Sequence, residues 1–172
     1  MREPHPPRPL WAPWRLTFVQ APPRRGCFLC LYARQRKDRS NLVVLRNRSC
    51  FALLNRFPYN SGHLMVAPRA HKSSLGALTA RERTDLLNLL VEMQRALDRV
   101  LRPEGYNVGL NLGRAAGAGI PGHLHVHVVP RWTGDTNFMP LVGQTKVIPQ
   151  ALEDLYSRLL GVLGRGRHRS SS

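Results

Sequence analysis

The sequence has 172 residues, of which 26 are lysine or arginine and 10 are aspartate or glutamate, so its formal net charge is +16. This length suits one compact domain with a hydrophobic core and is short for two. No apolar run approaches the roughly 20 residues of a membrane-spanning helix, and three cysteines are too few for a disulfide framework. We therefore expect a soluble, cytoplasmic protein with anionic partners, and the charge alone does not choose between nucleic acid and small phosphorylated substrates.

The two ends of the chain differ from its middle in composition. Residues 1–25 are rich in proline and arginine, which predicts an irregular arm and not a secretory signal. Residues 164–172 are basic and end in three serines, which predicts a disordered tail. Residues 26–163 remain as the folded domain.

The first half of this domain has a strand-like pattern. Short apolar runs at 41–46, 49–55 and 63–67 predict three strands. The proline, asparagine and glycine of 56–62 predict a turn between the second and third of them, so that pair is expected to be antiparallel.

The second half contains the most secure helix. Thr79 and Glu82 have the spacing of a capping box, and apolar residues then recur at helical spacing up to Pro103. Further strands are expected at 106–112 and 123–130, and a last helix over roughly 149–163. This order predicts an α+β domain built on an antiparallel sheet, with one long helix and a C-terminal helix.

Three histidines alternate with apolar residues in the sequence His123-Leu-His-Val-His-Val-Val-Pro130. On a strand, His123, His125 and His127 share one side, while the residues between them face a core. Such a face could hold a metal ion with three imidazoles, or could present one nucleophilic histidine oriented by its neighbours. A solvent-facing strand that is merely rich in histidine is the remaining interpretation.

The loop before this strand favours phosphorus chemistry. Glycines at 113, 117 and 119 allow backbone N–H groups to approach an anion closely. A glycine-rich loop alone is weak evidence, because most such loops are flexible connectors. A possible phosphate cradle directly before a histidine face is a much more specific combination.

The segment HLHVHVVP matches the His-φ-His-φ-His-φ-φ signature (φ apolar) of the histidine triad, or HIT, superfamily. The chain is further similar to the bacterial diadenosine tetraphosphate phosphorylase branch of that superfamily, over residues 10–163. The similarity is carried by LWAPWR (10–15), NVGLNLG (107–113), HLHVHVVPRW (123–132), GDTNF (134–138) and KVIPQ (146–150). It implies a HIT-like fold, with 26–163 as a nucleotide-binding catalytic domain.

The resemblance also implies catalytic roles. His125 would attack the α-phosphorus of a nucleotide and form a covalent nucleotidyl-histidine. His127 would lie near the phosphate and leaving-group oxygens, and His123 would orient the nucleophile by hydrogen bonding. No catalytic metal would be needed.

Nucleotide contacts follow from the same resemblance. Asn55 matches the ribose-binding position, and His63 lies at the edge of the same pocket. Phosphate would be held by Asn111 and by the backbone of 117–119, and a purine could stack on Trp132. The residues of this expected pocket are Asn55, His63, Asn111, Gly117, Ala118, Gly119, His127 and Trp132. Independently of the family, Arg114 and Arg131 are candidates for neutralising phosphate charge.

The expected reaction is the conversion of diadenosine tetraphosphate and inorganic phosphate to ADP and ATP by a homodimer or homotetramer. Gly119 departs from the family, in which many hydrolases have glutamine and the phosphorylase branch has serine, so the acceptor is open between phosphate and water. A polyphosphate hydrolase or phosphoramidase is the nearest alternative. A basic nucleic-acid or nucleotide-binding module without turnover is the alternative from another class.

A second site is implied by Cys27 and Cys30, which have C-x-x-C spacing. Some bacterial triad proteins bind structural zinc with such a pair, a histidine after the second strand, and the first triad histidine. The matching ligands are Cys27, Cys30, His71 and His123, a set that would close a tetrahedral site. The plain alternative is a pair of loop cysteines beside an exposed histidine. Cys50 lies within a strand and is expected to be a buried small residue.

Overall fold

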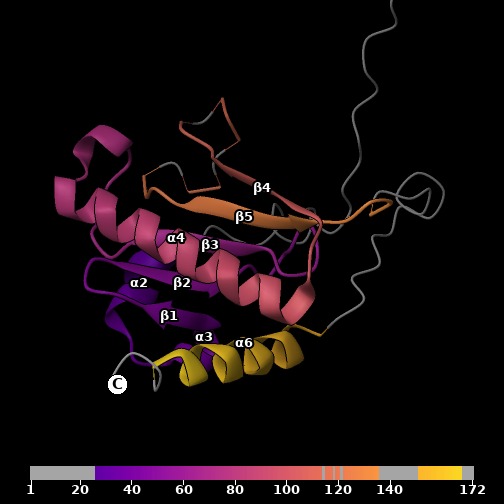
Figure 1. Ribbon diagram of the computed structural model, residues 1–172. Helices are drawn as coiled ribbons and strands as arrows, with labels where there is room; N and C mark the ends of the chain where they lie inside the picture. The colour runs from indigo at the N-terminus through magenta and orange to yellow at the C-terminus, as the bar shows by residue number, and fades with distance from the viewer. Residues whose placement is uncertain (1–25, 114, 118, 121, 136–150, 168–172) are drawn as a thin grey trace, which may run out of the picture.

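The computed structural model describes residues 26–113, 115–117, 119–120, 122–135 and 151–167. The predicted N-terminal arm, Arg114 and Ala118 lie outside this part. The described chain forms one five-stranded sheet with neighbours in the order β1-β2-β3-β5-β4, and every neighbouring pair is antiparallel. Helices lie on both sides of the sheet (Figure 1). The predicted α+β class with an antiparallel sheet is confirmed.

The five strands match the five that the sequence predicts, with differences at their ends. They are β1 (Val43–Arg46), β2 (Cys50–Leu54), β3 (Leu64–Pro68), β4 (Gly105–Leu110) and β5 (Val126–Arg131). The first begins two residues later than expected, because Asn41 ends a helix and Leu42 takes a left-handed conformation with φ of 56°. The last begins at Val126, so His123 and His125 precede the regular ladder.

One face of the sheet is covered by α4 (Ala80–Leu101) and α6 (Leu152–Arg167). The predicted capping box is confirmed, since Thr79 and Glu82 satisfy one another's backbone N–H groups at the start of α4. The main core lies between these helices and the sheet, and it includes Leu124, Val126 and Val128. α6 continues to Arg167, so the predicted tail at 164–172 begins inside a helix. Within the described residues, no helix has the length and apolar character needed to cross a bilayer.

The other face is covered by α2 (Phe28–Arg34), a helix that the sequence analysis did not predict. Its apolar positions Leu29, Tyr32 and Ala33 have helical spacing and pack on the sheet. Two further short elements, α3 (Asp38–Asn41) and the 3₁₀ turn η1 (Leu75–Ala77), were likewise not predicted.

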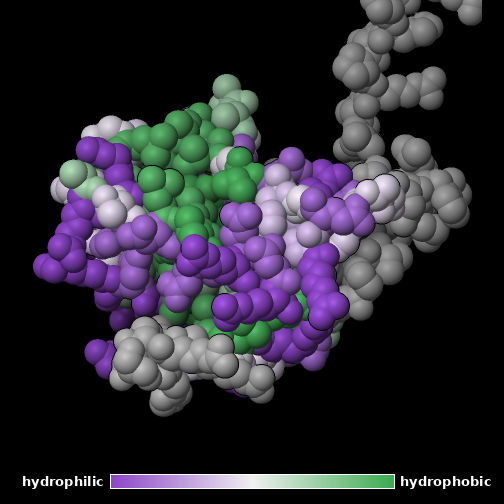
Figure 2. All heavy atoms as spheres, viewed as in Figure 1, coloured by the Kyte–Doolittle hydropathy of each residue, from purple (hydrophilic) through white to green (hydrophobic). Residues whose placement is uncertain are grey.

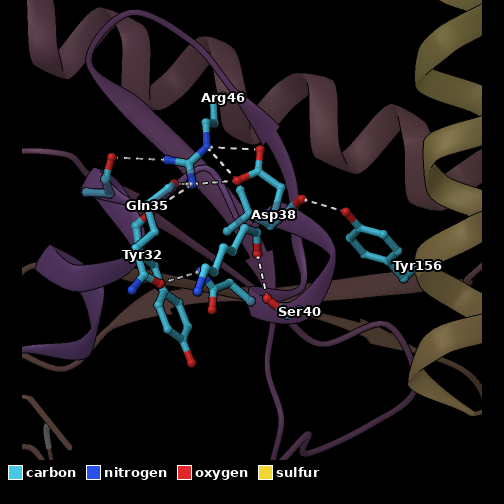
Figure 3. A network of polar contacts seen from close by, with 10 residues as sticks. Tyr32, Gln35, Asp38, Ser40, Arg46 and Tyr156 are labelled. Atoms are coloured by element: carbon cyan, nitrogen blue, oxygen red, sulfur yellow. Dashed lines mark hydrogen bonds and ion pairs between the residues drawn. The ribbon is translucent and has the colours of Figure 1, made fainter.

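Arg46 fixes the end of α2 to the sheet (Figure 3). Its guanidinium donates to the carbonyls of Tyr32 at 2.7 Å and Gln35 at 3.1 Å, which α2 leaves unpaired at its C-terminus. The same group pairs with Asp38 of α3 at 2.7 Å. On the far side of β1, the Tyr156 hydroxyl of α6 donates to the Val43 carbonyl at 3.2 Å. Both helical layers are therefore tied to the β1 edge.

The strand register decides which face carries the histidines. Met65 of β3 is the partner of His127 on β5, and Met65 belongs to the smaller core under α2. Leu124, Val126 and Val128 face α4 instead. The predicted alternation is thus confirmed, and the triad histidines lie on the face opposite α4 and α6.

Candidate active site

His125 is held by the backbone two residues before it. Its Nδ1 lies 2.8 Å from the carbonyl oxygen of His123, and the side chain is 7% exposed. Because a carbonyl only accepts hydrogen bonds, Nδ1 carries a proton, and in the neutral imidazole Nε2 then bears the lone pair. The resemblance implies that His123 orients His125 by hydrogen bonding, and in the structure the hydrogen bond comes from the His123 main chain.

His127 is paired with a fourth histidine. Its Nδ1 lies 2.9 Å from Nε2 of His63, which is buried at the start of β3. The amide N–H of Tyr59 donates to Nδ1 of His63 at 3.0 Å, and the Tyr59 ring stacks on that imidazole. Burial, followed by the neighbouring His125, lowers the pKa of His127 to about 4. His127 is therefore neutral at pH 7.

The His123 ring points away from His127 and into a cluster with two cysteines. Its Nε2 donates to the Pro68 carbonyl at 2.8 Å, which leaves the lone pair on Nδ1. That Nδ1 lies 3.2 Å from Cys27 Sγ and 3.4 Å from Cys30 Sγ. His71 completes the group, with Nδ1 at 3.1 Å from Cys30 Sγ.

This cluster could hold a metal ion. The donor atoms of Cys27, Cys30, His71 and His123 all lie within 4.8 Å of one another. Two thiols and two imidazoles are a donor set that suits zinc, and the Pro68 carbonyl supplies the outer hydrogen bond that presents a His123 lone pair to it. Burial and the neighbouring Cys27 thiol raise the pKa of Cys30, so a bare pair of thiolates is disfavoured and a divalent cation would supply the missing charge.

The glycine-rich loop leads directly to these histidines. Leu110, the last residue of β4, pairs with Val126, the first residue of β5, and Asn111 is the next residue along the chain. Gly113 and Gly117 have φ of 81° and 77°, values that other residues rarely adopt. Gly119 is exposed.

Two residues that were expected to contact the nucleotide, Trp132 and Arg131, lie away from the triad. Trp132 follows the far end of β5, about 16 Å along the strand from His127, and its indole N–H donates to the Arg102 carbonyl at the end of α4. Arg131 pairs with Asp135 at 2.6 Å and donates to Asn107. The structure therefore does not bring Trp132 or Arg131 to the triad, because the strand on which they lie carries them away from it.

Comparison with known proteins identifies the fold and the histidine motif together. The family model described as "HIT domain" matches residues 36–134, more than half of the chain. The chain belongs to the HIT domain family.

Relatives within this family include named enzymes. The chain is 44% identical over 153 residues to a Mycobacterium tuberculosis protein named "AP-4-A phosphorylase", an alignment that covers 84% of this chain and 78% of the relative. It is 33% identical over 100 residues to a Schizosaccharomyces pombe protein named "Bis(5'-nucleosyl)-tetraphosphatase [asymmetrical]", with coverage of 58% and 54%.

A solved structure has the same fold. The crystal structure of a "ZN-bound histidine triad family protein" from Mycobacterium smegmatis superposes with a TM-score of 0.67 at 22% identity. The superposition covers 84% of this chain and 97% of that one.

Sequence reasoning missed two residues of this HIT site. Tyr59 was read only as part of a turn, although an aromatic residue four positions before His63 is unusual in a segment of turn formers. Gly62 has φ of +80°, and a Cβ there would lie 2.5 Å from Leu101 Cδ1. No local pattern reveals that crowding, because it comes from a distant helix.

Proposed function

We propose that this HIT protein cleaves dinucleoside polyphosphates, with His125 as the nucleophile. The observation that carries the proposal is the hydrogen bond from His125 Nδ1 to the His123 carbonyl, which leaves an Nε2 lone pair on a buried imidazole. The 44% identity to a protein named "AP-4-A phosphorylase" supports diadenosine tetraphosphate as the substrate.

The proposed reaction has two steps. The Nε2 lone pair of His125 forms a bond to the α-phosphorus, the phosphorus–oxygen bond to the leaving nucleotide breaks, and its electron pair departs with that oxygen. The Nδ1 proton stays on His125, hydrogen-bonded to the His123 carbonyl throughout, so the intermediate is a nucleotidyl-imidazolium. Inorganic phosphate then attacks phosphorus and frees His125, so that ADP and ATP are the products.

The acceptor in the second step distinguishes the phosphorylase from its nearest alternatives. Attack by water would make the protein a polyphosphate hydrolase, and the relative named tetraphosphatase is consistent with that reading over 58% of the chain. Gly119 offers a backbone N–H but no side chain to position water. We therefore keep inorganic phosphate as the first choice.

Substrate contacts are proposed for further residues. Asn55, whose side chain contacts the His63 ring, is proposed to bind ribose. Asn111 and the backbone N–H groups of Gly117, Ala118 and Gly119 are proposed to hold phosphate oxygens, as anions are held by nests of backbone N–H groups. Stacking of a purine on Trp132 stays a prediction, and its indole N–H donates to the Arg102 carbonyl at the end of α4.

We further propose that the cysteine–histidine cluster binds structural zinc. The four donors fit a closed tetrahedral site with no position for substrate, and when bound the ion would supply rigidity instead of catalysis. In this proposal His123 has two roles. Its ring binds the metal, and its carbonyl accepts the hydrogen bond from His125.

A homodimer is proposed from an apolar surface between α4 and β4 (Figure 2). Leu87 and Val91 of α4 are 62% and 47% exposed, and Val108 of β4 is 56% exposed. β4 is an edge strand, so its outer backbone groups can pair with another strand. A two-fold contact would cover both features, although a tetramer would serve as well. A cytoplasmic location stays a prediction.

The experiment that tests the function is product analysis with diadenosine tetraphosphate, with and without inorganic phosphate. We expect ADP and ATP only when phosphate is present, and no product from His125→Ala. AMP and ATP without phosphate would indicate a hydrolase that uses the same nucleophile. If no nucleotide is turned over while oligonucleotides bind in a salt-dependent manner, the net charge of +16 reflects a nucleic-acid-binding module instead.

A further inference from the structure

Asp135 follows β5 and accepts hydrogen bonds both from that strand and from the distant turn at residues 56–62. Its Oδ2 accepts the Arg131 guanidinium at 2.6 Å, the Asn60 side-chain amide at 2.8 Å and the Trp132 N–H at 3.2 Å. Its Oδ1 accepts a second nitrogen of Arg131 at 2.8 Å. The Asp135 side chain is 9% exposed, so these charge-assisted hydrogen bonds form largely out of water and are correspondingly strong.

Asn60 connects Asp135 to the 56–62 turn. Its side-chain nitrogen donates to Asp135 and also to the Pro130 carbonyl at 3.1 Å. Both partners only accept hydrogen bonds, so they fix the orientation of the Asn60 amide. The main-chain carbonyl of Asn60 accepts the His63 N–H at 3.1 Å. The side chain of Asn60 therefore attaches the turn to the end of β5, and its main chain continues into the candidate site.

The same turn orients groups that face the candidate site. Oδ1 of Asn55 accepts the Phe57 N–H at 3.0 Å, so the turn holds the amide that is proposed to bind ribose. The Tyr59 N–H donates to His63 Nδ1 at 3.0 Å, and the Tyr59 ring stacks on the His63 ring. A displacement of the turn would therefore move the Asn55 amide and the Tyr59 ring together.

We propose that Asp135 is a positioning residue, which holds the 56–62 turn through Asn60 and so raises the affinity of the site for the nucleoside part of its substrate. This inference rests on the proposed function and adds to it a residue that lies outside the triad. A turn that is already ordered loses less conformational freedom when a ligand binds. The effect falls on binding more than on chemistry, because the hydrogen bond that orients His125 lies within residues 123–125.

Thr133 offers a matched control in the segment that carries Asp135. Both its N–H, at 2.9 Å, and its hydroxyl donate to the Glu104 carboxylate. This contact joins the segment after β5 to the residue before β4, and not to the 56–62 turn. Thr133→Val removes the hydroxyl and keeps the N–H, so it weakens the segment without touching the contact between Asp135 and Asn60.

The first test needs no substrate. Amide hydrogen exchange in the whole protein reports the Phe57 and Tyr59 N–H groups, which are bonded within the turn. In Asp135→Ala we expect both to exchange about tenfold faster, while the amides of α4 keep their wild-type rates and Thr133→Val behaves as the wild type. Unchanged exchange of both groups overturns the proposal whether or not the protein turns over any nucleotide. Equal acceleration in α4 would show that Asp135 supports the whole fold, and it overturns the proposal as well.

The second test is a double-mutant cycle on AMP binding, measured by calorimetry. Asp135→Ala and Asn60→Ala should each weaken AMP binding about tenfold, and the double variant should lose no more than either one, because both changes remove the same link. Asp135→Asn should lose less, since it keeps one oxygen that accepts from Asn60. Additive losses would show that Asp135 acts by another route, such as its contact with Trp132, and would overturn the proposal.

Kinetics with diadenosine tetraphosphate complete the comparison. We expect Asp135→Ala to raise KM about as much as it weakens AMP binding, with little change in kcat. A loss confined to kcat would overturn the proposal. A wild-type protein that binds AMP but does not cleave the tetraphosphate contradicts the proposed function alone, and the binding cycle still decides the role of Asp135.

Discussion

His125 donates its Nδ1 proton to the backbone carbonyl of His123 across 2.8 Å, and the His123 ring faces the thiols of Cys27 and Cys30. The residue that orients the proposed nucleophile is therefore also a proposed metal ligand. Any movement of the His123 ring is transmitted to the carbonyl through one short stretch of backbone. The cysteine–histidine cluster and the proposed nucleophile are therefore connected through the ring and the main chain of His123.

This coupling predicts the effect of removing a thiol. In Cys30→Ser we expect loss of bound zinc, a lower Tm, and a kcat reduced about tenfold because the His123 carbonyl is no longer fixed. Metal analysis of the purified protein, thermal unfolding and steady-state kinetics measure the three effects. Cys50→Ala is the matched control, because Cys50 is buried on the α4 side of the sheet and its pKa is raised to about 12. Retention of one zinc per chain by Cys30→Ser would contradict the proposed ligand set.

Gly62 precedes His63 and cannot accept a side chain. Its φ is +80°, and an added Cβ would lie 2.5 Å from Leu101 Cδ1 and 2.9 Å from Pro130 Cγ. We expect Gly62→Ala to lower the free energy of unfolding by about 2–4 kcal/mol. Gly161→Ala is the control within α6, where a Cβ meets no atom within 4 Å and should raise stability by up to about 1 kcal/mol. Urea unfolding measures the stability of both variants. Equal unfolding midpoints for Gly62→Ala and the wild-type protein would contradict the crowding at Gly62.

His127 predicts a pH dependence of stability. Its pKa is about 4 in the folded protein, below the ordinary value of 6.5, so the unfolded chain takes up a proton first as the pH falls. The free energy of unfolding should therefore decrease as the pH is lowered through 6.5, and this decrease should level off near pH 4. His127 contributes at most about 3 kcal/mol to the decrease. Denaturant titrations between pH 7 and 5 measure the slope, and His127→Asn should reduce it. The Glu82 carboxylate, with a pKa of about 2 caused first by its hydrogen bond from Lys72, loses its contribution only below pH 4.5.

Much of the fold could be predicted because its patterns are local. The capping box at Thr79, the leucine spacing of α4 and the alternation around His125 each depend on residues a few positions apart. Helix α2 was not predicted because its seven residues are too few to show a clear helical period. Leu29 and Tyr32 nevertheless have the spacing of one helix face. Leu42 delays the start of β1 to Val43 through a left-handed backbone conformation that the side chain itself does not indicate.

The sequence predicts which residues form the candidate site, but it does not predict which partner each side chain contacts. The place of His63 at the edge of a nucleotide pocket stays a prediction, and the structure adds that its ring pairs with His127. Purine stacking on Trp132 stays a prediction; because a strand rises about 3.3 Å per residue, Trp132 lies past the end of β5 that is far from His125. Which atom of a histidine is used depends on partners distant in sequence, such as the Pro68 carbonyl for His123.

The apolar surface between α4 and β4 predicts how the protein assembles. Val108 is 56% exposed on the edge strand and Leu87 is 62% exposed on α4, so a second copy that covers them would bury area otherwise in water. We expect Val108→Asp to convert the dimer to a monomer at micromolar concentration, measured by sedimentation velocity. Leu160→Glu is the control, because Leu160 is 38% exposed on α6, near the β1 edge of the sheet. A wild-type protein that sediments as a monomer, or a Val108→Asp variant that stays dimeric, would move the contact to another surface.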